Sequence, residues 1–195
     1  MPERGFNIDS LTSFLRETVR KIIGWVGQHL ASRAVNIEDL RKSSGILLPA
    51  PIFGYLDGAA DDELSKTRNN SDFNRYELLP RFLVDVTSID TSVAAMGANL
   101  AFPLICSPTG MSRLFHEKGE LAVASACEKA GILYSLSTLS TYSIEEVTEV
   151  SAGSKWFQIY VFKDRSLISE FMERCRESDF VGLTLTIDVP TQGNR

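Results

Sequence analysis

Hydrophobic and polar positions along this chain repeat with two different periods. From residue 104 onward, apolar runs that predict strands at residues 104–106, 133–136, 156–161 and 181–189 alternate with stretches of helical spacing at 118–130, 144–150 and 165–178. The strands begin about 25 residues apart, which is the length of one strand, one helix and two short loops. This order predicts consecutive βα units with parallel strands.

Two architectures fit this order: a doubly wound open sheet and a TIM (β/α)8 barrel. Side-chain alternation puts Gln158 and Tyr160 on one face of the third strand. It likewise puts Thr184, Thr186 and Asp188 on one face of the fourth strand. Helices on both faces of an open sheet would bury these groups at a cost on the order of a few kcal/mol each unless they are paired. A barrel interior accommodates them, so we expect an α/β chain with the first four units of a TIM barrel, preceded by N-terminal helices.

The leading segment predicts an amphipathic helix. Apolar residues recur at spacings of three and four between residues 9 and 33, and the opposite face is charged. Packing on its own protein or on an oligomer partner is favoured over a membrane surface. We assign residues 1–35 to this appended helix and 36–195 to the N-terminal part of a larger domain. A second helix is predicted to begin near Asn36 and to be interrupted at Ser43, Ser44 and Gly45.

Composition narrows the class of protein. With 44% apolar residues, 23% charged residues and a net charge of −5, the chain should be globular and is not expected to bind nucleic acid. Cys106, Cys127 and Cys175 are widely spaced, without a C-x-x-C pair that would suggest a metal, and predict buried free thiols. No secretory signal or apolar run of about 18 residues is visible. We expect a cytoplasmic protein, with the periphery of the inner membrane as the alternative location.

Polar groups at the ends of the predicted strands suggest a ligand. They belong to Ser107–Gly110, Ser137, Thr138, Gln158, Tyr160, Thr186 and Asp188. Neutral donors and acceptors that converge at one barrel mouth suit a planar heterocycle with amide edges, such as a flavin. Pro108 fixes a turn, and Gly110 lets the backbone approach a ring closely. Arg195 could offer a bidentate fork to a carboxylate.

Five ordered motifs carry a resemblance. They lie at residues 55–63, 102–111, 136–138, 156–161 and 186–190. With this order and spacing, the chain resembles the amino-terminal half of the FMN-dependent 2-hydroxy acid dehydrogenase and oxidase family, which includes L-lactate dehydrogenase, mandelate dehydrogenase and glycolate oxidase. The likeness covers residues 36–195. The chain departs from the family in its leading 35 residues and at Ala59, where glycine is common.

The resemblance implies FMN as cofactor and assigns residues to it. The backbone of Pro108, Thr109 and Gly110 would face the reactive edge of the flavin. Side chains of Ser137, Gln158 and Thr186 would hydrogen-bond its pyrimidine part.

The resemblance also implies a site for a small 2-hydroxy acid. Tyr55 and Arg195 would hold the substrate carboxylate, and Tyr160 would sit beside the substrate hydroxyl. Asp188 would orient a histidine base. In the family that histidine, a lysine near the flavin, a second arginine and the phosphate site follow on later strands. We expect them beyond residue 195, so that the chain alone is inactive; His29 and His116 do not match the catalytic position.

Gly110 favours a dehydrogenase, because oxidases of the family often have alanine at that position. The implied reaction is oxidation of an L-2-hydroxy acid of lactate or mandelate type to the 2-oxo acid, with electrons passed to a quinone or another carrier. One alternative is an inactive truncated product or one half of a split enzyme. Another is a different FMN barrel such as type 2 isopentenyl diphosphate isomerase, against which Tyr55, Tyr160 and Arg195 argue.

Overall fold

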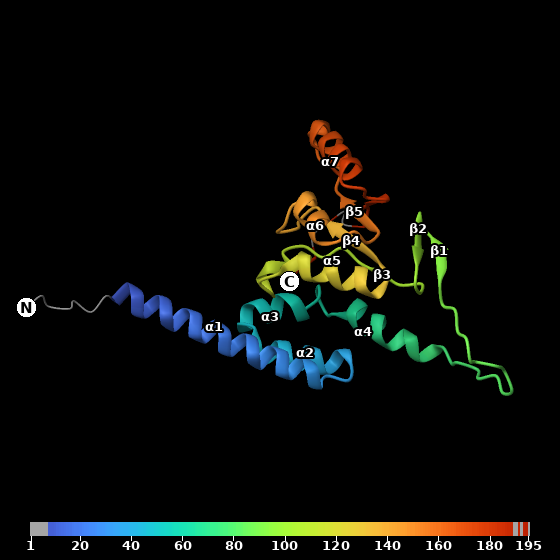
Figure 1. The fold of residues 1–195 in the computed structure, drawn as a ribbon, viewed down its shortest axis with the longest axis horizontal. Coiled ribbons are helices and arrows are strands. Elements are labelled where there is room, and N and C mark those ends of the chain that lie inside the picture. The colour runs from blue at the N-terminus through green and yellow to red at the C-terminus, as the bar shows by residue number, and fades with distance from the viewer. Residues whose placement is uncertain (1–7, 189–190, 192, 195) are drawn as a thin grey trace, which may run out of the picture. The chain divides into compact units, whose positions relative to one another are not determined.

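The computed structural model describes residues 8–188, 191 and 193–194, and the chain divides into two compact units (Figure 1). The first unit extends to residue 67 and the second begins at residue 68. Arg195 therefore lies outside the described residues. The domain boundary expected at residue 35 stays a prediction.

The first unit is helical. It contains α1 (Ile8–Arg33), α2 (Ile37–Leu47), α3 (Ala50–Asp57) and the start of α4 (Leu64–Ser71). Asn36 caps α2, because its side chain accepts a 2.9 Å hydrogen bond from the Asp39 N–H.

The expected interruption of the second helix is wrong, because α2 continues through Ser43, Ser44 and Gly45. The two serine hydroxyls donate to the carbonyls of Asp39 and Leu40, one turn earlier, at 2.8 and 2.9 Å. These hydroxyls therefore find partners within the helix instead of competing with it. The Phe53 ring of α3 packs over Gly45, where an added Cβ would lie 3.3 Å from the ring.

Ion pairs join the helices around α3, which carries Tyr55. Arg41 of α2 forms hydrogen bonds with the Asp57 carboxylate, and Lys66 of α4 lies 3.6 Å from it. The Arg41 hydrogen bond lowers the pKa of Asp57 to about 2. Tyr55 is thus on a short helix whose end is fixed by charged neighbours.

The second unit is built around a parallel sheet. A 3₁₀ turn, η1 (Asp72–Arg75), and an antiparallel hairpin of β1 (Val93–Ala95) and β2 (Ala98–Leu100) precede it. The sheet has the order β3 (Ile105–Cys106), β4 (Leu133–Ser137), β5 (Lys155–Ile159) and β6 (Gly182–Leu185), all parallel. The expected four strands, neighbouring in sequence order, are confirmed. β5 and β6 end earlier than expected, at residues 159 and 185.

Three helices cover one face of this sheet. They are α5 (Gly119–Ala130), α6 (Ile144–Val150) and α7 (Arg165–Glu177), and a further 3₁₀ turn, η2 (Ser112–Leu114), precedes α5. The strands contribute Tyr134, Leu136, Phe157 and Ile159 to the core that these helices share. On the same face of β6, Leu183 and Leu185 remain about half exposed, at 42% and 51%.

The hairpin packs against the other face, near the amino ends of the strands. Leu133 and Trp156 form a small cluster with Ala98 and Leu100 of β2, and the Trp156 indole N–H donates to the Met96 carbonyl at 3.3 Å. Within the described part of the second unit, α5, α6 and α7 all lie on the opposite face. Helices that cover only one face of the sheet are consistent with half of a TIM barrel. A doubly wound sheet would have helices on both faces, so this arrangement disfavours it.

Candidate functional site

A row of polar side chains crosses three neighbouring strands at their carboxyl ends. The Gln158 side-chain oxygen accepts hydrogen bonds from the Ser137 hydroxyl at 3.2 Å and from the Thr138 N–H at 3.1 Å. The Gln158 amide nitrogen donates to the Thr186 hydroxyl at 2.6 Å. The structure thus brings together Ser137, Gln158 and Thr186, which the sequence assigned to one ligand.

The row is held firmly in place. Ser137 and Gln158 are buried, and the Thr138 hydroxyl donates to the Gln158 carbonyl. The Leu139 N–H donates to the Ser137 hydroxyl oxygen at 3.1 Å. Partners on both sides of the Gln158 amide fix which way it points, so these groups can present a constant hydrogen-bonding pattern to a bound ligand.

The loop after β3 carries Pro108, Thr109 and Gly110. Gly110 lies against the loop after β4, where an added Cβ would be 2.8 Å from the Leu139 Cβ and 3.2 Å from the Leu139 carbonyl oxygen. Met111 has a φ of 56° and donates its N–H to the same carbonyl at 2.9 Å. The close approach of the loop after β4 therefore favours glycine at position 110, a reason that the sequence alone did not reveal.

The predicted substrate residues belong to different parts of the chain. Tyr160 follows β5, with its ring edge-on to Phe162 at a centroid distance of 6.5 Å. Asp188 lies beyond the end of β6 and is exposed. Tyr55 belongs to the first unit. The roles of Tyr55, Tyr160, Asp188 and Arg195 stay predictions.

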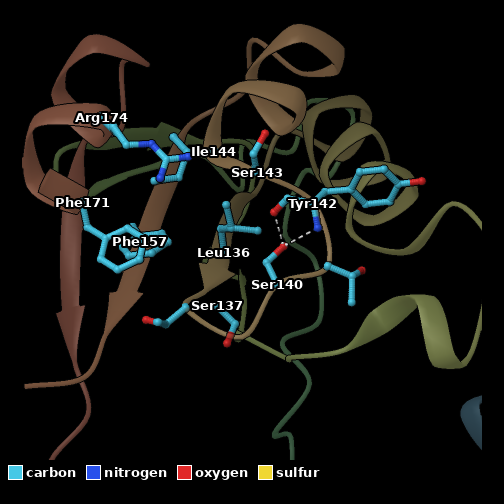
Figure 2. A pocket seen from close by; sticks show the side chains of 11 residues that line it. Leu136, Ser137, Ser140, Tyr142, Ser143, Ile144, Phe157, Phe171 and Arg174 are labelled. Carbon is cyan, nitrogen blue, oxygen red and sulfur yellow. Dashed lines mark hydrogen bonds between the residues drawn. The ribbon is translucent and has the colours of Figure 1, made fainter. Parts of the chain in front are cut away.

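A pocket of about 280 Å³ lies on the other side of β4 and β5, between the loop after β4 and helices α6 and α7 (Figure 2). Leu136, Phe157 and Phe171 form its apolar wall, with the two rings 5.3 Å apart. Arg174 lines it while binding both oxygens of Glu145 at 2.8 Å. Ser137 and Thr138 also line this pocket, whereas Gln158 and Thr186 do not.

Both histidines have local structural contacts. His29 stacks on Trp25 with ring centroids 5.6 Å apart, and the His116 Nδ1 accepts from the Lys118 N–H at 3.2 Å. Among the described residues, no three His, Cys, Asp or Glu side chains are grouped so that they could hold a metal ion. The same residues include no helix with the length and apolar character to cross a membrane.

Two residues near the row have roles that the sequence did not predict: Thr138, which it counted only among the polar groups at strand ends, and Glu120. Thr138 binds Gln158 through both its N–H and its hydroxyl. Glu120, in the first turn of α5, is fully buried and accepts hydrogen bonds from Ser112 and Thr141. A glutamate near a helix start suggests only a favourable position near the helix dipole, so its burial was not predictable from spacing.

Comparison with known proteins decides the family. The model of a family described as FMN-dependent dehydrogenase matches residues 46–195. The chain belongs to this family. Glycolate oxidase 3 of Arabidopsis thaliana is 36% identical over 160 residues, which are 82% of this chain and 44% of that protein. The 4-hydroxymandelate oxidase of Amycolatopsis orientalis is 35% identical over 161 residues, which are 83% of this chain and 45% of that protein.

Solved structures confirm the barrel fold. A crystal structure of mandelate oxidase with a difluorinated hydroxy acid superposes with a TM-score of 0.78 at 35% identity, covering 83% of this chain and 49% of that one. A mandelate oxidase variant with a C4a-OH-FMN adduct gives a TM-score of 0.75 at 35% identity, covering 80% and 47%. FMN is the cofactor of this family of oxidoreductases. The chain spans less than half the length of these two relatives.

Proposed function

We propose that this chain carries the first half of the active site of an enzyme that oxidises an L-2-hydroxy acid, of lactate or mandelate type, to the 2-oxo acid. The observation that supports this most directly is the hydrogen-bonded row of Ser137, Gln158 and Thr186. Family membership supplies the reaction class, and this row supplies a surface suited to the cofactor.

The row fits the polar part of a flavin. FMN, when bound, supplies a ring that accepts the two electrons removed from the substrate. Its pyrimidine part offers carbonyl acceptors and an imide N–H, and neutral hydroxyl and amide side chains match such groups without burying a charge. In this proposal Ser137, Gln158 and Thr186 bind that edge. The backbone of Pro108, Thr109 and Gly110 faces the reactive edge.

Side chains of this chain bind and orient the substrate through its carboxylate and its hydroxyl. Arg195 and Tyr55 hold the carboxylate, since a guanidinium offers two parallel donors and a phenol a third. Tyr160, two residues after Gln158 on the same side of the chain, reaches the substrate hydroxyl. With carboxylate and hydroxyl both fixed, the substrate C–H has one orientation.

Proton removal requires a base, and neither His29 nor His116 matches the position of the family's catalytic histidine. In this proposal Asp188 orients a histidine from the remaining strands of the barrel and stabilises its protonated form. The Asp188 carboxylate is exposed here, so it is accessible to such a partner. Gly110 favours a quinone or another carrier over oxygen as the electron acceptor.

The experiment compares the 195-residue chain alone with the chain co-expressed with the remaining strands of a full-length relative. Flavin absorbance after gel filtration measures retained FMN, and dye reduction with lactate, mandelate and glycolate measures turnover. We expect neither from the chain alone and both from the complemented protein. A missing base typically costs a factor of roughly 100 to 10,000 in rate. Stoichiometric flavin with turnover in the chain alone would show that the active site has been misplaced.

Gln158→Met provides the specific variant, because methionine keeps the shape of glutamine and removes both amide groups. We expect the complemented variant to lose at least about tenfold in FMN affinity, as expected when hydrogen bonds to a buried ligand edge are removed. Gln28→Met, at an exposed position on α1, is the matched control and should bind FMN normally. Equal FMN retention by Gln158→Met and the unmodified protein would refute the role of the row.

A further inference from the structure

The Glu120 side chain joins two loops that the sequence separates. It is 0% exposed, and one of its oxygens accepts from the N–H groups of Ser112 at 3.1 Å and Thr141 at 3.0 Å. The other oxygen accepts from the Thr141 hydroxyl at 2.6 Å. A buried carboxylate is costly unless its oxygens are satisfied, and here three donors satisfy them.

The three donors come from both loops at the carboxyl edge of the sheet. Ser112 follows directly on the loop after β3, which carries Pro108 to Gly110. Thr141 belongs to the loop after β4, which begins just past Ser137. A second connection runs beside the first, because the Met111 N–H donates to the Leu139 carbonyl at 2.9 Å. Gly110 meets Leu139 at the same place.

The charge state of Glu120 suits this arrangement. Burial alone would raise its pKa, but hydrogen bonds from Thr141 and Ser112 outweigh burial and hold the pKa below the ordinary value. Glu120 is therefore ionised at neutral pH. An ionised carboxylate offers acceptors only, which is what three converging donors require.

We propose that Glu120 is a positioning residue that locks the loop after β3 to the loop after β4, so that 108–110 and Ser137 form one rigid surface. The link to a flavin rests on the proposed function, whereas the locking itself does not. Groups that bind a planar ring from two loops must keep their spacing within a fraction of an ångström, and one buried anion shared by both loops provides this.

Amide hydrogen exchange of the 195-residue chain, measured residue by residue by NMR without FMN, tests the locking. Ser112 and Thr141 lose their acceptor directly in Glu120→Ala, so the decisive amide is Met111, whose acceptor is Leu139. We expect Met111 to exchange at least about tenfold faster in Glu120→Ala, while Leu136 and Phe157 in the strands keep their protection. Glu120→Gln retains one acceptor oxygen and should restore most of the protection.

Two variants make the test specific. Thr141→Val removes one donor without emptying the site, and should speed Met111 exchange by a smaller factor even if Glu120→Ala does not fold. Glu146→Ala removes the hydrogen bond that the Glu146 carboxylate accepts from the Ser143 N–H. It leaves the connection between the loops intact, so the exchange rate of Met111 should not change. Unchanged Met111 exchange in both Glu120→Ala and Thr141→Val would overturn the proposal. Equal losses throughout β4 and β5 would also overturn it, by showing a general role in stability.

Discussion

Gln158 and Thr186 lie on neighbouring parallel segments, and the Gln158 amide donates a 2.6 Å hydrogen bond to the Thr186 hydroxyl. Thr184, on the same face of β6, has a buried hydroxyl without a partner among the described residues. Thr184 in β6 and Thr186 just after it therefore differ in whether the hydroxyl has a hydrogen-bond partner. This difference allows the contribution of the polar row to be measured against an internal control.

Thr186→Val should destabilise the second unit by about 1–3 kcal/mol, because it leaves a Gln158 N–H without its acceptor. Thr184→Val should be neutral or stabilising, since it removes a hydroxyl that gains nothing from burial. Urea denaturation gives both free energies of unfolding. Similar losses in the two variants would mean that the Gln158 hydrogen bond contributes nothing specific.

Gly110→Ala should push the two loops apart, because the new Cβ would lie 2.8 Å from the Leu139 Cβ. Overpacking of this kind costs about 1–3 kcal/mol. A double-mutant cycle with Leu139→Gly, followed by urea denaturation, separates this contact from other effects. The cost of the alanine should fall in the Leu139→Gly background. If it stays the same, the Leu139 side chain is not what disfavours alanine at position 110.

Native Cys127 and Cys175 should resist alkylation. Both are buried, and burial raises the pKa of each thiol to about 12, so almost no thiolate exists at pH 8. Cys106 is partly exposed, which differs from the expectation that all three thiols would be buried. Mass spectrometry after iodoacetamide treatment should find Cys106 modified first, and Cys106→Ala should remove this early label. Early labelling of Cys127 would contradict the packing of α5.

The ion pair of Arg174 with Glu145 should make the free energy of unfolding depend on pH in the acidic range. The Arg174 hydrogen bond lowers the pKa of Glu145 to about 2, so the stabilisation is complete above its ordinary pKa near 4.5 and is lost as the pH falls toward 2. Because both side chains are partly exposed, we expect only about 0.5–1 kcal/mol. Urea midpoints at pH 7 and pH 3 should differ less in Arg174→Met than in the unmodified chain.

Arg176→Met is the control for this acid dependence. Arg176 pairs with Glu173 on the same helix, but its side chain is 77% exposed, and water screens such a pair strongly. This variant should keep the acid dependence of the unmodified chain. If it behaves like Arg174→Met, general charge on α7 is responsible and the Glu145 pair is not.

The strands and the shared face of Gln158 and Thr186 were predictable from the sequence, because period-two alternation directly determines which side chains share a face. The continuation of α2 through Ser43 to Gly45 was not, because propensity ignores the bonds from the two hydroxyls and the Phe53 ring over the glycine. Tertiary contacts outweighed the local preference there.

The candidate site divides in the same way. The site residues on strands could be predicted from side-chain alternation and from the family motifs. The role of Glu120 could not, because it depends on which loops contact each other. Its partners Ser112 and Thr141 lie 8 and 21 positions away in the sequence. No local pattern connects positions separated in this way, and the contact exists only once β3 and β4 are paired.

The last prediction concerns α1, on which several apolar side chains are exposed to solvent. Val19, Ile22 and Ile23 are each at least 50% exposed, and Trp25 is 67% exposed. Covering these four side chains is worth roughly 5 kcal/mol or more in area terms, before entropy is subtracted. We therefore expect the chain to associate through this helix, and Ile22→Glu combined with Ile23→Glu should shift sedimentation toward smaller species. Lys21→Gln, also exposed on α1, is the control and should sediment like the unmodified chain. Deletion of residues 1–33 should have the same effect as the double substitution, and liposome flotation distinguishes a membrane surface from an oligomer partner. If the deletion changes neither particle size nor solubility nor flotation, α1 contributes no interaction surface.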